Sequence, residues 1–325
     1  MLTMLMSALT GIVGDSIWVH CIIIVVGIMI VLGGADWLTK GAVGLAERMR
    51  IPQIVIGLTI VAMGTSMPEF FVSLLSALKG TPDLAVGNVV GSNIFNTYLI
   101  VGLAAAVAPI HILKSTVKRD IPFALLASAA LLGMSLDGNI TRTDAGILFL
   151  LFCLFMAVTL HYAKGQKEEV DVSQTPLNSW KALLFILVGL AGLIIGSNFF
   201  VESATQVASS LGVSDAIIGL TIVAGGTSLP ELATSLVAAK RGNSGIAIGN
   251  VLGSNVFNIL MILGLTGLVS PMEIQGITTL DFVMMLISVV LLWLFSFTKY
   301  LIARWEGVVL TAIYVGYVTY LIMNI

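Results

Sequence analysis

Long apolar stretches alternate with short polar segments along the whole chain. Ten of these stretches are about 20 residues long, the length at which an apolar helix crosses a bilayer. They begin near Ile17, Ile51, Leu84, Asp120, Ala145, Lys181, Val213, Gly245, Leu280 and Trp305. This pattern predicts an all-α polytopic membrane protein with ten transmembrane helices.

One apolar stretch, Ile54 to Leu78, is interrupted at its centre by the hexapeptide GTSMPE at residues 64–69. An acid at the centre of a membrane helix costs about 2.5–3.5 kcal/mol on insertion scales, so such residues usually face partners, ions or water inside a bundle. Pro68 has no N–H to return to the carbonyl of Gly64, and the helix is expected to open just before Glu69. Loosened backbone oxygens beside a carboxylate favour a cation site. The alternative is a proline kink with a hydrogen-bonded glutamate.

The interrupted stretch occurs twice. GTSLPE at residues 226–231 repeats the first hexapeptide 162 positions later, and 27 of the 47 positions between 57–103 and 219–265 are identical. Both copies end in G-S-N-x-F-N, at residues 91–96 and 253–258. The identities concentrate on Gly, Ser, Thr, Asn, Pro and Glu rather than on apolar residues. An internal repeat of this kind decides the architecture of the chain.

The repeat divides the chain into two halves of five spans. An odd number of crossings separates their starts, so the second half crosses the membrane in the opposite direction. We predict residues 1–163 as the first inverted repeat with the N-terminus outside, 164–180 as a short cytoplasmic linker, and 181–325 as the second inverted repeat. With this orientation thirteen of the fifteen Lys and Arg residues lie on the cytoplasmic side, as the positive-inside rule requires. Inverted repeats with broken helices place a binding site near the bilayer midplane.

Composition narrows the classes of function. Hydrophobic residues make up 58% of the chain, charged residues 10%, and the mean hydropathy is +1.07, far from a soluble domain. The net charge of −2 gives no sign of nucleic-acid binding. The spans contain no nucleophile with a neighbouring base and no His-Glu-x-x-His motif, so we expect neither an enzyme nor a cofactor. We expect a multi-pass protein of the cell membrane, of the bacterial inner-membrane type, surrounded by lipid and with no protein partner evident.

The two acids form one site if the halves come together. Glu69 and Glu231 are then expected to meet at the midplane, flanked by hydroxyl and amide side chains. These flanking residues are Thr65, Ser66, Asn96, Thr227, Ser228 and Asn258. All are hard oxygen donors, which suit Ca²⁺ with its roughly six to eight oxygen ligands. No thiolate or imidazole joins them to select zinc or copper.

A polar stripe follows each hexapeptide. Three polar residues are spaced four apart in each copy: Asn88, Ser92 and Asn96 in the first, Asn250, Ser254 and Asn258 in the second. Residues four apart share one face of a helix. The stripes either line the ion site or hydrogen-bond to neighbouring helices, because polar side chains commonly join membrane helices.

The carboxylate pair also indicates a mode of transport. Two carboxylates close together in a low dielectric are unfavourable unless positive charge lies between them. One Ca²⁺, several Na⁺ or protons can each supply that charge, but these ions cannot all occupy the site together. Competition for one site that opens to either side in turn is antiport. Acidification is expected to inhibit binding of divalent cations by protonating the acids.

At these residues the chain resembles prokaryotic members of the sodium/calcium exchanger family, in the cation/calcium exchanger superfamily. The paired GTSxPE and GSNxFN segments are similar to the two alpha repeats of that family. The resemblance implies Na⁺/Ca²⁺ antiport, with Glu69 and Glu231 as Ca²⁺-binding acids and the carbonyl oxygens of Thr65 and Thr227 beside them. It also implies sodium ligands: Ser66, Ser92, Asn96, Ser228 and Ser254, with the backbone of Ala62 and Ala224.

One position limits this resemblance. Potassium-dependent relatives carry an acid where Asn258 stands, and some prokaryotic relatives also have Asp there. With a neutral residue at this position we expect transport without a requirement for K⁺. The second hypothesis is H⁺-coupled exchange of Ca²⁺ or another divalent cation. A channel is disfavoured, because it needs an open conduit rather than a buried pair of carboxylates.

Overall fold

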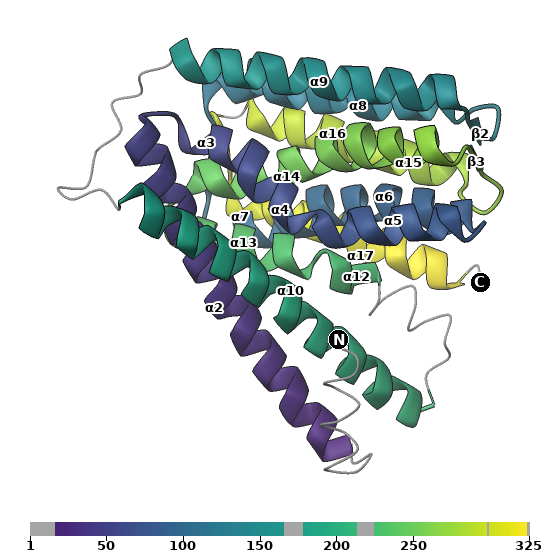
Figure 1. Ribbon diagram of the computed structural model, residues 1–325, viewed down its shortest axis with the longest axis horizontal. Helices are drawn as coiled ribbons and strands as arrows, with labels where there is room; N and C mark the ends of the chain where they lie inside the picture. Colours follow the sequence, from purple (N-terminus) through teal and green to yellow (C-terminus); the bar gives the residue numbers. More distant parts are fainter. Residues whose placement is uncertain (1–16, 166–177, 213–223, 298, 324–325) are drawn as a thin grey trace.

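The computed structural model describes residues 17–165, 178–212, 224–297 and 299–323, which are almost entirely helical (Figure 1). Most of the predicted linker and the start of the span predicted near Val213 lie outside these ranges. The division into 1–163, 164–180 and 181–325 therefore stays a prediction.

The elements of the first half follow one another without long loops. They are α2 (Ile17–Met49), α3 (Gln53–Ile56), the π-helical turn η1 (Gly57–Val61), α4 (Ala62–Thr65), α5 (Met67–Leu78), α6 (Pro82–Ile94), the π-helical turn η2 (Phe95–Ile100), α7 (Val101–Val107), β1 (Ile110–His111), the π-helical turn η3 (Thr116–Asp120), α8 (Ile121–Met134), β2 (Asn139–Ile140) and α9 (Arg142–Gly165).

The described elements of the second half have the same order. They are α10 (Ser179–Ser210), α12 (Ala224–Thr227), α13 (Leu229–Lys240), α14 (Ser244–Val256), the π-helical turn η5 (Phe257–Ile262), α15 (Leu263–Val269), β3 (Met272–Glu273), α16 (Thr279–Ser296), β4 (Leu301–Ile302) and α17 (Arg304–Met323). Corresponding elements such as α5 and α13, η2 and η5, and α9 and α17 begin 162 positions apart.

Seven of the described helices are long and apolar enough to cross a membrane. The bent pair made of Gln53–Thr65 and Met67–Leu78 raises the number to eight if the pair is one span. The outer helices expose large apolar side chains, among them Trp18, Met29 and Leu150, each about 70% exposed. An apolar surface of this extent suits a bilayer, where lipid tails cover it. The predicted polytopic helical membrane protein is confirmed at this level.

Two short strand pairs join the halves at separate places. Strand β1 pairs with β4 through Ile110 and Ile302, and β2 pairs with β3 through Ile140 and Met272. Both pairs are antiparallel. Met272 follows Ile110 by 162 positions and Ile140 precedes Ile302 by 162 positions, so the second pair repeats the first with the two halves interchanged. The β2–β3 pair lies at the end of the bundle where α9 begins (Figure 1). Each half thus contributes one strand to each of two equivalent strand pairs, which connect the halves.

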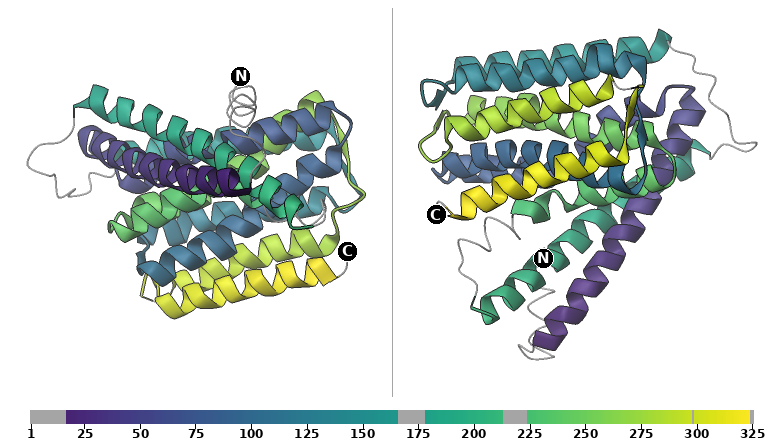
Figure 2. Two further views of the ribbon diagram at one scale, coloured as in Figure 1. Left: turned by 90° about the horizontal axis from the view of Figure 1, so that it is seen from below. Right: turned by 180° about the vertical axis from the view of Figure 1, so that it is seen from behind.

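Helices α2 and α10 lie side by side along most of their length and slant away from the other helices (Figures 1 and 2). Glycines allow their backbones to touch. A Cβ atom at Gly34 would lie 2.8 Å from the carbonyl oxygen of Gly189, and one at Gly189 would lie 2.5 Å from the nitrogen of Leu38. Small residues at such a contact are the usual means by which membrane helices approach closely.

We expect Gly34→Ala to separate α2 from α10 and to lower the melting temperature in detergent by several degrees. The added methyl group meets backbone atoms that cannot turn aside, and overpacking of this kind costs about 1–3 kcal/mol. Gly33→Ala is the matched control, because among the described residues no heavy atom beyond the adjacent turns of its own helix lies within 4 Å of a Cβ placed there. Equal melting temperatures for the two variants would contradict the close contact.

An ion-pair cluster fixes α2 to the end of α13. Asp36 on α2 pairs with Lys40 one turn further along at 2.8 Å, and with Arg241, which directly follows α13. The three side chains are one quarter to less than one half exposed, so the solvent screens their attraction in part. The ion pairs thus join α2 of the first repeat to the end of α13 in the second repeat.

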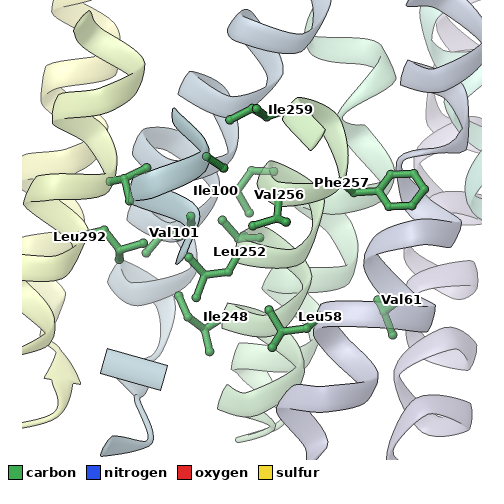
Figure 3. Close-up of a cluster of buried hydrophobic side chains, with 14 of the residues drawn as sticks. Leu58, Val61, Ile100, Val101, Ile248, Leu252, Val256, Phe257, Ile259 and Leu292 are labelled. Carbon is green, nitrogen blue, oxygen red and sulfur yellow. The ribbon is translucent and has the colours of Figure 1, made fainter. Parts of the chain in front are cut away.

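The core is centred on α14, whose residues from Ile246 to Val256 are all buried. Ile248, Leu252 and Val256 of this helix pack beside Leu58 and Val101 (Figure 3). A helix that is buried on all sides lies in the interior of a bundle. This position carries the polar residues of α14 into the middle of the molecule.

Candidate cation-binding site

A break in the helix places each acid at the start of a new helix. The first helix ends at Thr65 and α5 begins at Met67, with a bend of 47° between the two segments. Ser66 stands at the break with φ −83° and ψ 8°. Ser228 stands at the equivalent break with φ −90° and ψ 8°. The opening expected from the proline of each hexapeptide is therefore present, in the same form in both copies.

The two acids are buried and each receives a hydrogen bond from the other repeat. Glu69 and Glu231 are both 1% exposed. The hydroxyl of Ser66 donates to Glu231 Oε1 at 2.9 Å, and the hydroxyl of Ser228 donates to Glu69 Oε1 at 3.1 Å. Glu69 thus bonds to a serine 159 positions away rather than to Ser66, its near neighbour in sequence. We call this arrangement the crossed pair.

The threonines and the remaining serines surround the crossed pair. Thr65 also lies against the Glu231 carboxylate, and Thr227 against that of Glu69. Ser254 Oγ lies 3.5 Å from Glu231 Oε1, and the hydroxyls of Ser92 and Ser228 are 3.3 Å apart. The structure thus brings the predicted hydroxyl residues of both hexapeptides and Ser254 to the two acids, and Ser92 to Ser228.

The first asparagine of each stripe supports the backbone of the site. Asn88 Nδ2 donates to the Glu69 carbonyl oxygen at 3.1 Å and to Ser73 Oγ at 2.9 Å. Asn250 makes the same two bonds with the Glu231 carbonyl oxygen and Ser235, at 3.2 and 3.0 Å. For these two residues, hydrogen bonding between helices is the correct interpretation of the stripe.

Asn96 and Asn258 lie in the π-helical turns η2 and η5, next to the first residue of each turn. Asn96 Nδ2 donates to Asn255 Oδ1 at 3.1 Å, and Asn258 Nδ2 donates to Asn93 Oδ1 at 3.3 Å. Both residues are buried. Their side-chain nitrogens are thus occupied, which leaves the oxygens for other partners.

Four buried side-chain oxygens of this region accept no hydrogen bond within the described part of the chain. They are Glu69 Oε2, Glu231 Oε2, Asn96 Oδ1 and Asn258 Oδ1. Leaving a buried polar atom unpaired costs about 1–3 kcal/mol, and more for a charged group. The four residues form two pairs related by the repeat, Glu69 with Glu231 and Asn96 with Asn258. Two carboxylate and two amide oxygens are the types of donor that suit a hard cation.

Two predicted ligands are backbone groups of the alanines that begin α4 and α12. The Ala62 carbonyl oxygen accepts the Ser66 N–H at 3.0 Å and the Thr65 hydroxyl at 3.3 Å, so it is already engaged within its own helix. Ala224 is the first residue of α12, at the equivalent place in the second repeat. Their role as sodium ligands stays a prediction, as does that of Ser92 and Ser254.

Asn93 and Asn255, which bind Asn258 and Asn96, were not among the residues predicted for the site. Both stand in the repeated GSN sequence, and this repetition was the available signal. Among the described residues, no three of His, Cys, Asp and Glu gather as a metal cluster.

The chain matches a sequence model of the family described as sodium/calcium exchanger protein. The match occurs twice, over residues 19–161 and over residues 181–323. The two matched segments are themselves 162 positions apart. Each half of the chain is therefore similar to the same model.

Two curated proteins match nearly the full length. The putative antiporter CaxA of Alkalimonas amylolytica is 36% identical, and the match covers 92% of this chain and 97% of that protein. The sodium/calcium exchanger MaX1 of Methanosarcina acetivorans is 33% identical, over 94% of this chain and 99% of that protein.

A solved structure agrees with the fold. The sodium-calcium exchanger NCX_Mj, soaked with 2.5 mM Na⁺ and 0.1 mM Ca²⁺, superposes with a TM-score of 0.81 at 31% sequence identity. The superposition covers 91% of this chain and 96% of that one. The arrangement of helices around the two acids is thus similar to that of a structurally characterised exchanger.

Proposed function

The chain belongs to the sodium/calcium exchanger family, and from that membership we propose that it is a secondary active antiporter exchanging Na⁺ for Ca²⁺ across the membrane. Members of this family are ion transporters rather than enzymes. The exchange proceeds by alternating access at a midplane site built on Glu69 and Glu231. No resident cofactor takes part, because Ca²⁺ and Na⁺ are the transported substrates.

The observation that carries the proposal is the set of four buried, unpaired oxygens, two on the crossed pair itself and two on Asn96 and Asn258. Two carboxylates supply two negative charges, which one Ca²⁺ or two Na⁺ would neutralise. The hydroxyls of Ser66 and Ser228 hold one oxygen of each carboxylate and leave the second for an ion. Since the same oxygens serve both cations, binding of one displaces the other.

Ten spans in two inverted repeats are the architecture we propose for this exchange. Three observations support it: the constant offset of the elements, the exchanged strand pairs, and the crossed pair itself. Inverted repeats allow two conformations of similar energy that open one site to opposite sides of the membrane. The remaining predicted ligands, Thr65, Thr227, Ser92, Ser254, Ala62 and Ala224, belong to the same proposal.

We infer that K⁺ is not required. Asn258 contributes a neutral amide where potassium-dependent relatives carry an acid, so the site has two negative charges rather than three. The amide is buried, and Asn93 holds its nitrogen.

Uptake of ⁴⁵Ca²⁺ into proteoliposomes tests the proposal. We expect an outward Na⁺ gradient to drive uptake severalfold above the level without a gradient, in buffers free of K⁺. Uptake driven by a pH gradient but not by Na⁺ would instead establish H⁺-coupled exchange. A strict requirement for K⁺ would contradict the role given to Asn258.

A further inference from the structure

Asn93 and Asn255 bind the amide nitrogens of two proposed ligands, each in the opposite repeat. Asn255 accepts from Asn96, and Asn93 accepts from Asn258, at 3.1 and 3.3 Å. All four side chains are at most 2% exposed. We propose that Asn93 and Asn255 are positioning residues that aim the side-chain oxygens of Asn258 and Asn96 at the transported ion and thereby set the affinity of the site. The proposal rests on the proposed function, since it concerns the same site.

An asparagine needs such control to serve as a cation ligand. Its amide group has an acceptor oxygen and a donor nitrogen of nearly the same size, and rotation about χ2 exchanges them. With the oxygen forward the group binds a cation, and with the nitrogen forward it repels one. A hydrogen bond that occupies the nitrogen selects the useful orientation. The unpaired oxygens of Asn96 and Asn258 are the result of this selection.

The direction of the hydrogen bond between Asn258 and Asn93 is determined by the backbone carbonyl oxygen of Asn255, which can only accept. Asn93 Nδ2 donates to the Asn255 carbonyl oxygen at 3.4 Å, and lies 3.7 Å from Met285 Sδ. A carbonyl oxygen has no hydrogen to donate, so the Asn93 nitrogen must face it. The Asn93 oxygen must then face Asn258, and Asn258 must donate. A backbone group thus determines the orientation of this ligand through one intermediate side chain.

The hydrogen bond between Asn96 and Asn255 is oriented by a side chain rather than by a backbone group. Asn255 Nδ2 donates to Thr97 Oγ1 at 2.7 Å, a short bond to a hydroxyl that is able either to accept or to donate. The matching position in the second repeat is Ile259, which has no polar side chain. The two amide ligands are therefore held by unequal means, although the two acids are held alike.

The contact between Asn93 and Asn258 also explains why a neutral residue suits position 258. The oxygen of Asn93 faces that side chain. An ionised acid there would set two oxygens against each other in a buried site, which is unfavourable without a proton or cation between them. Asn93 is thus matched to an amide rather than to a carboxylate.

Equilibrium binding of ⁴⁵Ca²⁺ to the purified protein tests the proposal through Asn93→Leu and Asn255→Leu. Leucine has a similar size but neither accepts nor donates, so one amide ligand becomes free to rotate. We expect the half-saturating Ca²⁺ concentration to rise about tenfold in each variant. Asn93→Ser restores an acceptor and should recover part of the affinity, a recovery that packing alone would not produce.

Three results would overturn the proposal. The first is an unchanged half-saturating Ca²⁺ concentration in both leucine variants. The second is a lower melting temperature without any change in Ca²⁺ affinity, the mark of a purely structural role. The third is an affinity in Asn93→Ser no better than in Asn93→Leu.

If the leucine variants do not fold, Thr97→Val decides the question, because it removes the anchor of Asn255 with almost no change of shape. A severalfold weaker affinity supports the proposal, and an unchanged affinity overturns it. The binding assay is separate from transport. Failure of Na⁺-driven uptake by the wild-type protein would refute the proposed exchange, whereas the binding comparison would still test the positioning residues.

Discussion

Replacement of Glu69 or Glu231 by glutamine is expected to reduce Na⁺-driven ⁴⁵Ca²⁺ uptake into proteoliposomes at least 100-fold. Each substitution keeps the shape of the side chain but removes one of the two buried acids of the proposed cation site. A bound cation and each carboxylate would form a buried pair of opposite charges, and removing one partner of such a pair costs about 3–5 kcal/mol. About 1.4 kcal/mol corresponds to a factor of ten in binding. We expect the loss to be of similar size for both acids, because their environments match.

Glu202→Gln is the control for this experiment. Glu202 lies on α10 outside the crossed pair, so its substitution makes the same chemical change without altering the site. We expect its uptake to stay within twofold of the wild type. Retention of uptake by either Glu69→Gln or Glu231→Gln, in protein that elutes as a single species, would rule out the two-acid site.

A second large effect is expected from the crossed pair. Ser66→Ala removes a hydroxyl donor from a buried carboxylate, which costs about 1.5–3 kcal/mol, and should lower the melting temperature by several degrees. The hydroxyl bonds to Glu231 and not to Glu69. In a Glu231→Leu background Ser66→Ala should therefore have almost no further effect, whereas in a Glu69→Leu background its full effect should persist.

The equivalent substitution in the second repeat, Ser228→Ala, supplies the control. Ser228→Ala should lose its effect in the Glu69→Leu background and keep it in the Glu231→Leu background, since Ser228 donates to Glu69. Non-additivity between residues in contact is the signature of a direct interaction. If each serine were instead coupled to the glutamate three positions along its own segment, the crossed arrangement would be wrong.

Much of this site is visible in the sequence because its signals are local. An acid and a proline inside an apolar run are conspicuous, and their recurrence 162 positions later identifies two related halves. The bend before Glu69 follows from proline chemistry alone. The proximity of the two acids and their flanking serines was also expected from residue types, and the structure brings these side chains together.

Other features depend on how distant segments pack, and no local pattern encodes them. Nothing near Ser66 indicates that its partner is Glu231 rather than Glu69. The π-helical turn at Phe95–Ile100 contains neither glycine nor proline to announce it. The bond between Asp36 and Arg241 spans α2 and the end of α13, so sequence spacing cannot reveal it.

The crossed pair has a consequence for the biosynthesis of this protein. Glu69 enters the membrane before its partner serine has been translated, because 159 residues separate them. At about 5–20 residues per second, the ribosome needs roughly 10–30 s to reach that serine. During this interval the nascent first half carries an acid without its hydroxyl partner, and an arrested chain never acquires one. We therefore expect half-length translation products to be retained by the insertion machinery and degraded, rather than to persist as stable membrane proteins.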